Sequence, residues 1–136
     1  MDDSSRAPPD ERRADADPRL GPRLGAAELD AVLREGAALF DAGQHWHAHE
    51  AWEAAWHRAP AGERDFFRGL IHAAAALVHH ARGNAYGFER QRARMEARLA
   101  AYLPRHHGID LASLRAALAR LPAAGQRADY PRLGVA

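Results

Sequence analysis

Apolar residues recur at the spacing of an α-helix from Ala26 to Leu121, and glycine or proline interrupts this pattern repeatedly. A left-handed glycine ends a helix at low steric cost, and a proline disfavours a helical residue before it. The expected helix ends are marked by Gly43, Pro60, Gly83, Pro104 and Pro122. β-branched residues are scarce, and there is neither an alternating run nor an Asn-Gly turn, so no strand or β-hairpin is expected. The sequence predicts an all-α fold, a single five-helix bundle.

The arrangement expected for this bundle is two antiparallel helical hairpins plus a C-terminal helix. A weak repeat favours it, because residues 39–46 and 79–86 each contain a helix end, a glycine, an amide side chain and then an aromatic residue. Such segments are typical of tight turns between antiparallel helices. Asn84 and Asp110 are the expected N-terminal caps of the fourth and fifth helices.

Composition divides the chain into three parts. Residues 1–24 hold four of the eight prolines among Asp, Arg and Ser, and we expect a disordered tail because such a segment buries too little apolar surface to order. Residues 25–122 form the predicted bundle, and residues 123–136 form a C-terminal extension. The chain has no cysteine, which excludes disulfides and thiolate metal sites and fits a cytoplasmic location.

The charge pattern predicts no nucleic-acid partner and no membrane partner. The formal net charge is +1, and the arginines of the fourth helix are interleaved with Glu89 and Glu96, as on a solvated helix face. No apolar run reaches the ~18 residues of a membrane helix, and the N-terminal segment lacks the apolar core of a secretory signal.

The segment 43–57 concentrates the residues that could carry chemistry, with all three tryptophans and four of the nine histidines. On a helix, residues four apart share a face, so His49 and Glu53 lie together, while Glu50 lies about 100° around the axis. Carboxylates are rarely buried unless they are paired or bind a metal, so this face predicts a site. Trp52 is expected to pack on the small side chains of the next helix, Gly69 and residues 73–76.

The next helix carries His72 and His79 seven positions apart, and therefore on one face. If this face meets His49 and Glu53, four possible ligands converge between two antiparallel helices. Imidazole and carboxylate suit a divalent metal such as zinc or manganese, and helical bundles build metal sites from facing helices. The predicted metal ligands are therefore His49, Glu53, His72 and His79, although the histidine spacing of zinc proteases is absent.

Several short patterns occur together between residues 27 and 104. They are Phe40-x-x-Gly43, His49-Glu50-x-Trp52-Glu53-x-x-Trp56, Phe67-x-Gly69-Leu70-Ile71, His79 and Gly83-Asn84-x-x-Gly87. In this combination they resemble the small helical bacterial and archaeal family catalogued as domain of unknown function 309. The resemblance implies an all-α bundle with no assigned activity. The residues that match the pattern include His49, Glu50, Glu53 and His79, whereas His45, His47 and His72 depart from it.

The function that the sequence favours for this cluster is a structural polar network or interaction module, and the metal site is the alternative. In the network, His49 and Glu53 hydrogen-bond His79, Asn84 or a helix end and fix how the helices pack. In a third interpretation, Glu50 or Glu53 acts as the catalytic general base of a hydrolase-like enzyme, with or without a metal, and His49 tunes its pKa.

Two further features concern partners and ions. A five-helix bundle cannot fully cover Trp46 and the rim of Trp52, and large exposed apolar side chains often mark an interface, so a homodimer or a protein partner is expected. The adjacent His106 and His107 fall in an expected loop, where two imidazoles can chelate metal from solution without a functional role.

Overall fold

The computed structural model describes residues 21–134, and the first 20 residues of the tail predicted over residues 1–24 lie outside the described residues. The described chain is mostly helical, as predicted. Its α-helices are α2 (Ala26–Asp41), α3 (His45–Arg58), α4 (Ala61–Ala81), α5 (Ala85–Leu99) and α6 (Leu111–Arg120). Two short 3₁₀ helices complete the helical part, η3 (Ala100–Tyr102) and η4 (Arg127–Asp129).

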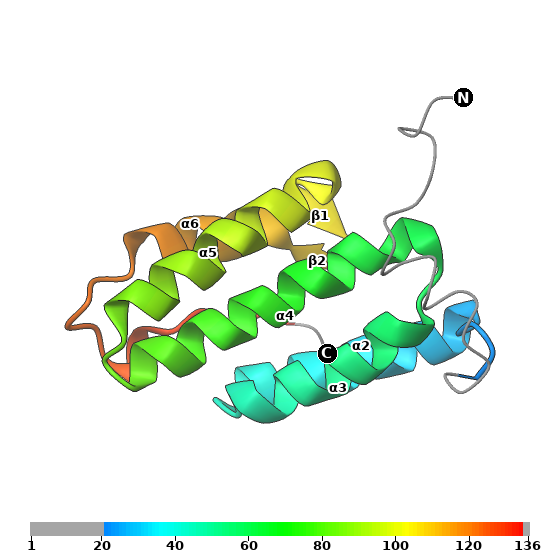
Figure 1. Ribbon diagram of the computed structural model, residues 1–136, viewed down its shortest axis with the longest axis horizontal. Coiled ribbons are helices and arrows are strands. Elements are labelled where there is room, and N and C mark those ends of the chain that lie inside the picture. The colour runs from blue at the N-terminus through cyan, green and yellow to red at the C-terminus, as the bar shows by residue number, and fades with distance from the viewer. Residues whose placement is uncertain (1–20, 135–136) are drawn as a thin grey trace.

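Helix α4 is the centre of the molecule. It contacts α3 on one side and α5 on the other, while α2 packs against α3 and α6 packs against α5 (Figure 1). The helix ends agree with the predicted boundaries, because α3 stops before Pro60 and α5 begins after Asn84, whose side chain accepts a hydrogen bond from the Gly87 N–H at 2.9 Å. Asp110 caps α6 in the same way through the Ser113 N–H.

The turns after α2 and α4 are built alike, as the weak repeat predicted. Gly43 and Gly83 are both left-handed, with φ of 80° and 72°. In each turn the glycine N–H donates to the carbonyl three residues back, and the next N–H donates to the carbonyl five residues back, which is the Schellman motif. The donors and acceptors are Gly43 to Phe40, Gln44 to Leu39, Gly83 to His80 and Asn84 to His79.

The expectation that the chain contains no β-hairpin is wrong at residues 105–110. Strands β1 (Arg105–His106) and β2 (Ile109–Asp110) pair antiparallel, with His106 opposite Ile109. The two linking residues, His107 and Gly108, have φ of 49° and 81°, and two positive φ angles are what a type I′ hairpin turn requires. Asn-Gly is the usual sequence of this turn, but histidine also tolerates the left-handed region, so a search for Asn-Gly misses it.

The partner of Trp52 also differs from the expected one. Trp52 is fully buried, a Cβ built on Gly36 of α2 would overlap its indole, and its Nε1–H donates to the Leu33 carbonyl at 3.3 Å. Gly69 of α4 instead makes room for Leu99 of α5. Because α3 lies between α2 and α4, its largest side chain can point to either neighbour, and the periodicity of α3 alone does not say which.

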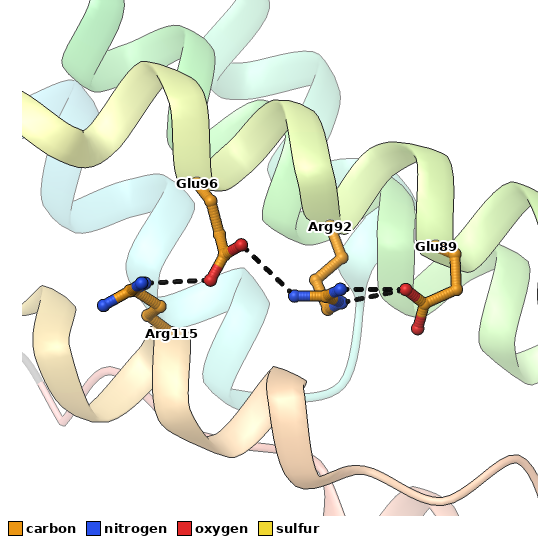
Figure 2. Close-up of polar contacts among 4 residues, drawn as sticks. All are labelled: Glu89, Arg92, Glu96 and Arg115. Carbon is orange, nitrogen blue, oxygen red and sulfur yellow. Dashed lines mark hydrogen bonds and ion pairs between the residues drawn. The ribbon is translucent and has the colours of Figure 1, made fainter.

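Charged side chains join α5 to α6 (Figure 2). Arg92 lies between two glutamates, 2.9 Å from Glu89 and 3.3 Å from Glu96, and Glu96 also accepts a hydrogen bond from Arg115 of α6 at 2.8 Å. The hydrogen bond to Glu89 is the main cause that raises the pKa of Arg92 above its usual value. Arginines and glutamates of α5 therefore pair with one another along this face.

Both ends of the described chain pack on the bundle. Leu24, within the predicted tail, is buried, and its N–H donates to the Arg58 carbonyl at 2.9 Å. In the C-terminal extension, the Tyr130 hydroxyl lies 2.6 Å from Nδ1 of His80, and the Leu133 N–H donates to Asp41 at 2.6 Å. Within residues 21–134, no helix combines the length and the apolar character needed to cross a bilayer.

Candidate functional site

A cleft of about 190 Å³ opens where α3, α4 and α5 meet. Three of the five predicted site residues lie on its wall, namely His49, Glu53 and His72, which the sequence expected to converge between two helices. The full lining comprises His49 and Glu53 from α3, Arg68, Ile71, His72 and Ala75 from α4, and Gln91 from α5.

His49 is held between an acid and an aromatic ring of its own helix. Its Nδ1 lies 3.5 Å from Glu53 Oε2, an ion-pair distance that is long for a hydrogen bond, and the atom is buried without a hydrogen-bond partner. The Trp46 indole stacks on the imidazole, with 5.0 Å between ring centroids and 6° between planes. The position of the ring is therefore fixed, while Nδ1 keeps an unused hydrogen-bonding capacity.

His72 is a buried imidazole that α5 holds in place. Its Nδ1 lies 2.7 Å from Oε1 of Gln91, which leaves Nε2 as the acceptor of a neutral ring if Nδ1 carries the proton. Burial is the main cause that lowers the pKa of His72, and the bond with Gln91 only partly offsets it. The guanidinium groups of Arg68, Arg94 and Arg98 lower the pKa further, so the ring is neutral at pH 7.

Arg68 is the wall residue that the sequence interpretation missed. Its guanidinium carbon lies 4.6 Å from the centroid of the Trp56 ring, and its Nε is buried without a hydrogen-bond partner. Arg68 precedes His72 by four positions on α4, so helical spacing could have placed it on the same face. Gln91 had no comparable signal, because its place depends on how α5 packs on α4.

The other two predicted site residues lie elsewhere. Glu50 is exposed and pairs with His47 at 3.5 Å on the surface of α3. His79 lies in the last turn of α4, where its Nδ1 accepts a hydrogen bond from Asn84 Nδ2 at 3.1 Å, and a Cβ built on Gly87 would overlap its ring. Neither residue is part of the cleft lining.

A second group of histidine and glutamate lies at the other end of α4. Among residues 21–134, Glu63, His106 and His107 form the group whose possible metal-ligand atoms all come within 4.8 Å of one another. Nε2 of His106 lies 2.9 Å from one Glu63 oxygen, and Nε2 of His107 lies 3.0 Å from the other. We refer to these three residues as the hairpin cluster.

Residues 33–91 match the family described as domain of unknown function (DUF309). No curated protein and no solved structure matches the chain. Every residue that lines the cleft falls within the matched segment, whereas His106 and His107 of the hairpin cluster lie beyond it. The cleft is therefore the site that belongs to the family segment, and the hairpin cluster extends beyond it.

Proposed function

Through residues 33–91 the chain belongs to the family described as domain of unknown function (DUF309), and we propose that the cleft within this segment binds a small organic acid that also carries a hydroxyl or amino group. The acid group pairs with Arg68, and the second polar group of the ligand bonds to His72 or Glu53. The proposal concerns binding and does not assign a reaction.

The observation that carries the proposal is a pair of buried nitrogens without hydrogen-bond partners in two residues that line the cleft. They are Nδ1 of His49 and Nε of Arg68. Buried polar groups in folded proteins are nearly always satisfied, and leaving one unsatisfied costs about 1–3 kcal/mol. A ligand that supplies an acceptor to Arg68 and a polar group to His49 removes this cost. Binding is favoured because the two nitrogens are already desolvated in the folded protein, so the ligand gains their hydrogen bonds without that cost.

Charge decides which kind of ligand fits. Arg68 contributes a positive charge to the wall, and Arg94 and Arg98 act on His72 from α5. A carboxylate or phosphate group is attracted to this field, and a guanidinium forms charge-assisted bonds with either. Glu53 and the neutral His72 accept hydrogen bonds, which calls for a donor elsewhere on the ligand.

The volume of the cleft limits the ligand to a small molecule. About 190 Å³ corresponds to roughly six groups the size of a water molecule, at ~30 Å³ each. This is below the ~300 Å³ at which pockets for drug-sized ligands begin. A hydroxy acid or amino acid with three carbons has the right size, and a nucleotide or a peptide does not.

A divalent metal such as zinc or manganese is the alternative proposal for the same cleft. It is supported by His72, whose Nδ1 is tied to Gln91 so that Nε2 is available, and by the adjacent His49 and Glu53. The wall also carries the guanidinium of Arg68, and a cation of like charge is repelled there. The arrangement therefore favours an anion over a cation.

A homodimer or protein partner stays a prediction, and the exposed Trp46 supports it. Trp46 is 52% exposed, and its indole stacks on His49, which lines the cleft. A partner that covered Trp46 would also cover His49, so association and ligand binding would be coupled.

The test is a titration of the full chain with three molecules of similar size, followed by NMR of the His49 and His72 rings. L-Lactate carries both polar groups, propionate lacks the hydroxyl, and lactamide lacks the charge. We expect L-lactate to bind, propionate to bind more weakly and lactamide not to bind. Arg68→Met should weaken L-lactate binding by about 10- to 100-fold, because a hydrogen bond to a charged group contributes about 1.5–3 kcal/mol.

The matched control is Arg90→Met, which removes an exposed arginine of α5 that lies over Tyr86 rather than on the cleft wall. It should leave L-lactate binding unchanged. If none of the acids perturbs His49 or His72, or if the two arginine variants behave alike, the proposal is wrong. Perturbation of these rings by zinc chloride, lost in His49→Ala, would favour the metal alternative instead.

A further inference from the structure

The hairpin cluster joins two parts of the fold that are distant in sequence. Glu63 lies in the first turn of α4, whereas His106 ends β1 and His107 begins the turn of the hairpin. We propose that Glu63, His106 and His107 bind one divalent transition-metal ion, with zinc the best match. This site is separate from the proposed function of the cleft, since the two share no residue.

The distances are already close to those of a metal site. Two imidazole Nε2 atoms face the two oxygens of one carboxylate at 2.9 and 3.0 Å. Ligands bound tetrahedrally to zinc at ~2.0–2.1 Å are separated from one another by about 3.3 Å. The two nitrogen–oxygen distances therefore have to lengthen by only a few tenths of an ångström, and all the possible ligand atoms already lie within 4.8 Å of one another, so side-chain rotation can bring them around one ion.

The imidazoles are held in position by aromatic packing. The ring of Phe66, which is fully buried, presents its edge or face to both histidines, with centroid distances of 4.7 Å to His106 and 5.5 Å to His107. Tyr102 contacts His106 at 4.7 Å and is itself tied to the start of α4 by a hydrogen bond to the Gly62 carbonyl. Preorganised ligands lose little entropy when the ion binds.

The backbone of the hairpin places the second histidine. His107 has a φ of 49°, a conformation that few side chains adopt, and Gly108 follows with 81°. This type I′ turn brings the His106 and His107 rings to a centroid separation of 4.2 Å, so adjacent residues both reach Glu63. An extended backbone would instead direct successive side chains to opposite faces.

The surrounding charges do not oppose a cation as Arg68 does in the cleft. The arginine of the hairpin and the last arginine of α5 have carboxylate partners of their own, Arg105 with Asp110 at 3.6 Å and Arg98 with Asp65 at 2.8 Å. Glu63 is partly buried, with 22% of its side chain exposed, and it lies in the first turn of α4. The cluster therefore offers one carboxylate and two imidazoles as ligands.

The ligand set defines the chemistry that such an ion would have. Two histidines and one carboxylate hold zinc with a further position open to water, and the same set is used for ferrous iron. In the metal-free form Nε2–H of His106 donates to Glu63, and Nε2 of His107 lies 3.0 Å from the other Glu63 oxygen. A ring that binds the ion through Nε2 carries its proton on Nδ1 instead. His107 keeps 35% of its side chain exposed, so the open position faces solvent.

The experiment uses the full chain without a histidine tag and zinc chloride alone, measured by calorimetry. We expect one zinc per chain in wild type. His107→Asn removes one ligand but suits the type I′ turn better than histidine, so the hairpin should persist. Loss of an outer-shell partner alone weakens metal binding about 10- to 100-fold, so loss of this ligand should weaken it by more than about 100-fold. Glu63→Gln should do the same.

The matched control is His47→Ala, which breaks the exposed pair of His47 and Glu50 at 3.5 Å without touching the hairpin cluster. Zinc binding should be unchanged in this variant. NMR of the ring nitrogens adds a second readout, because zinc should move the protons of His106 and His107 to Nδ1 and leave His49 and His72 unaffected. Zinc binding that survives in folded His107→Asn, or no zinc binding in wild type, would overturn the proposal.

Discussion

Within residues 21–134, histidine meets glutamate in two buried or half-buried places, and the arginines around them differ. In the cleft, Arg68 lies on the wall beside His49, Glu53 and His72. In the hairpin cluster, the neighbouring Arg105 is paired with Asp110. Similar ligand atoms therefore lie beside an arginine in the cleft and beside an acid-paired arginine at the hairpin. The comparison teaches that the neighbouring charge, rather than the histidine and glutamate themselves, decides whether such a site favours an anion or a metal ion.

The two places also differ in how the chain assembles them. His49 and Glu53 are one turn apart on α3 and lie 3.5 Å from each other along the helix surface. Glu63 and His106 are 43 residues apart and face each other at 2.9 Å across two elements. A pair on one helix turn is set by spacing, whereas a pair across elements needs the fold to form first.

The largest predicted effect is the stabilisation of the folded protein when zinc binds to the hairpin cluster. At a free zinc concentration 100 times the dissociation constant, binding should stabilise wild type by about 2.7 kcal/mol. For a chain of this length that corresponds to a rise of roughly 10 °C in melting temperature. Differential scanning calorimetry with and without a chelator measures it, and Glu63→Gln should show no rise. An equal rise in both proteins would place zinc outside the hairpin cluster.

The next effect should appear in the cleft and not in the hairpin cluster, because it arises from the packing of α3. Gly36→Ala inserts a Cβ where the Trp52 indole lies, so we expect a loss of about 1–3 kcal/mol in the free energy of unfolding. The displaced α3 carries His49 and Glu53, so L-lactate binding should weaken as well. Zinc binding should remain, because α3 contributes nothing to the hairpin cluster. Urea unfolding and both titrations test this, and equal weakening of both ligands would contradict it.

A smaller effect is expected when the charge difference between the cleft and the hairpin cluster is removed by mutation. Arg68→Met keeps the length of the side chain and removes its charge, so the cleft loses its preference for an anion and no longer repels a cation. We expect weaker L-lactate binding together with a second, weaker zinc site that His49→Ala removes. Calorimetry should then give two zinc ions per chain instead of one. A single zinc ion in Arg68→Met would show that the guanidinium is not what excludes metal from the cleft.

The last effect concerns pH, and its size depends on how far the pH is lowered. Burial is the main cause that lowers the pKa of His45 from 6.5 to about 4, and Arg127 lowers it further. The unfolded chain therefore takes up a proton near pH 6.5 that the folded chain resists until about pH 4, so stability is full above pH 6.5 and falls as the pH drops toward 4. His72 acts in the same direction. The decline in melting temperature between these pH values should be shallower in His45→Phe and in His72→Gln than in wild type; parallel curves would contradict it.

Much of the fold followed from local signals. Gly43 and Gly83 end helices because glycine adopts the left-handed backbone, and Asn84 and Asp110 begin them because their side chains accept backbone N–H groups. These signals act within a few residues, so the sequence contains them completely. The hairpin was missed because its turn is His-Gly, a pair that fits the required φ angles but is not the common one.

The candidate sites divide in the same way. Helical spacing correctly placed His49 next to Glu53 and placed His72 on the wall of the same cleft. His79 instead hydrogen-bonds Asn84 at the end of α4. Gln91 and the partner choice of Trp52 depend on how three helices pack, which spacing on one helix does not determine. The hairpin cluster lies furthest from any sequence pattern, since Glu63 meets His106 and His107 only after α4 and the hairpin have both formed.

One measurement tests the central claim that neighbouring charge sets the ligand. Proton–nitrogen NMR of the histidine rings is recorded in two samples, one titrated with zinc chloride and the other with L-lactate. We expect zinc to shift His106 and His107 alone, and L-lactate to shift His49 and His72 alone. Zinc signals at His49 and His72 with none at the hairpin cluster, or L-lactate signals at His106 and His107, would contradict the account.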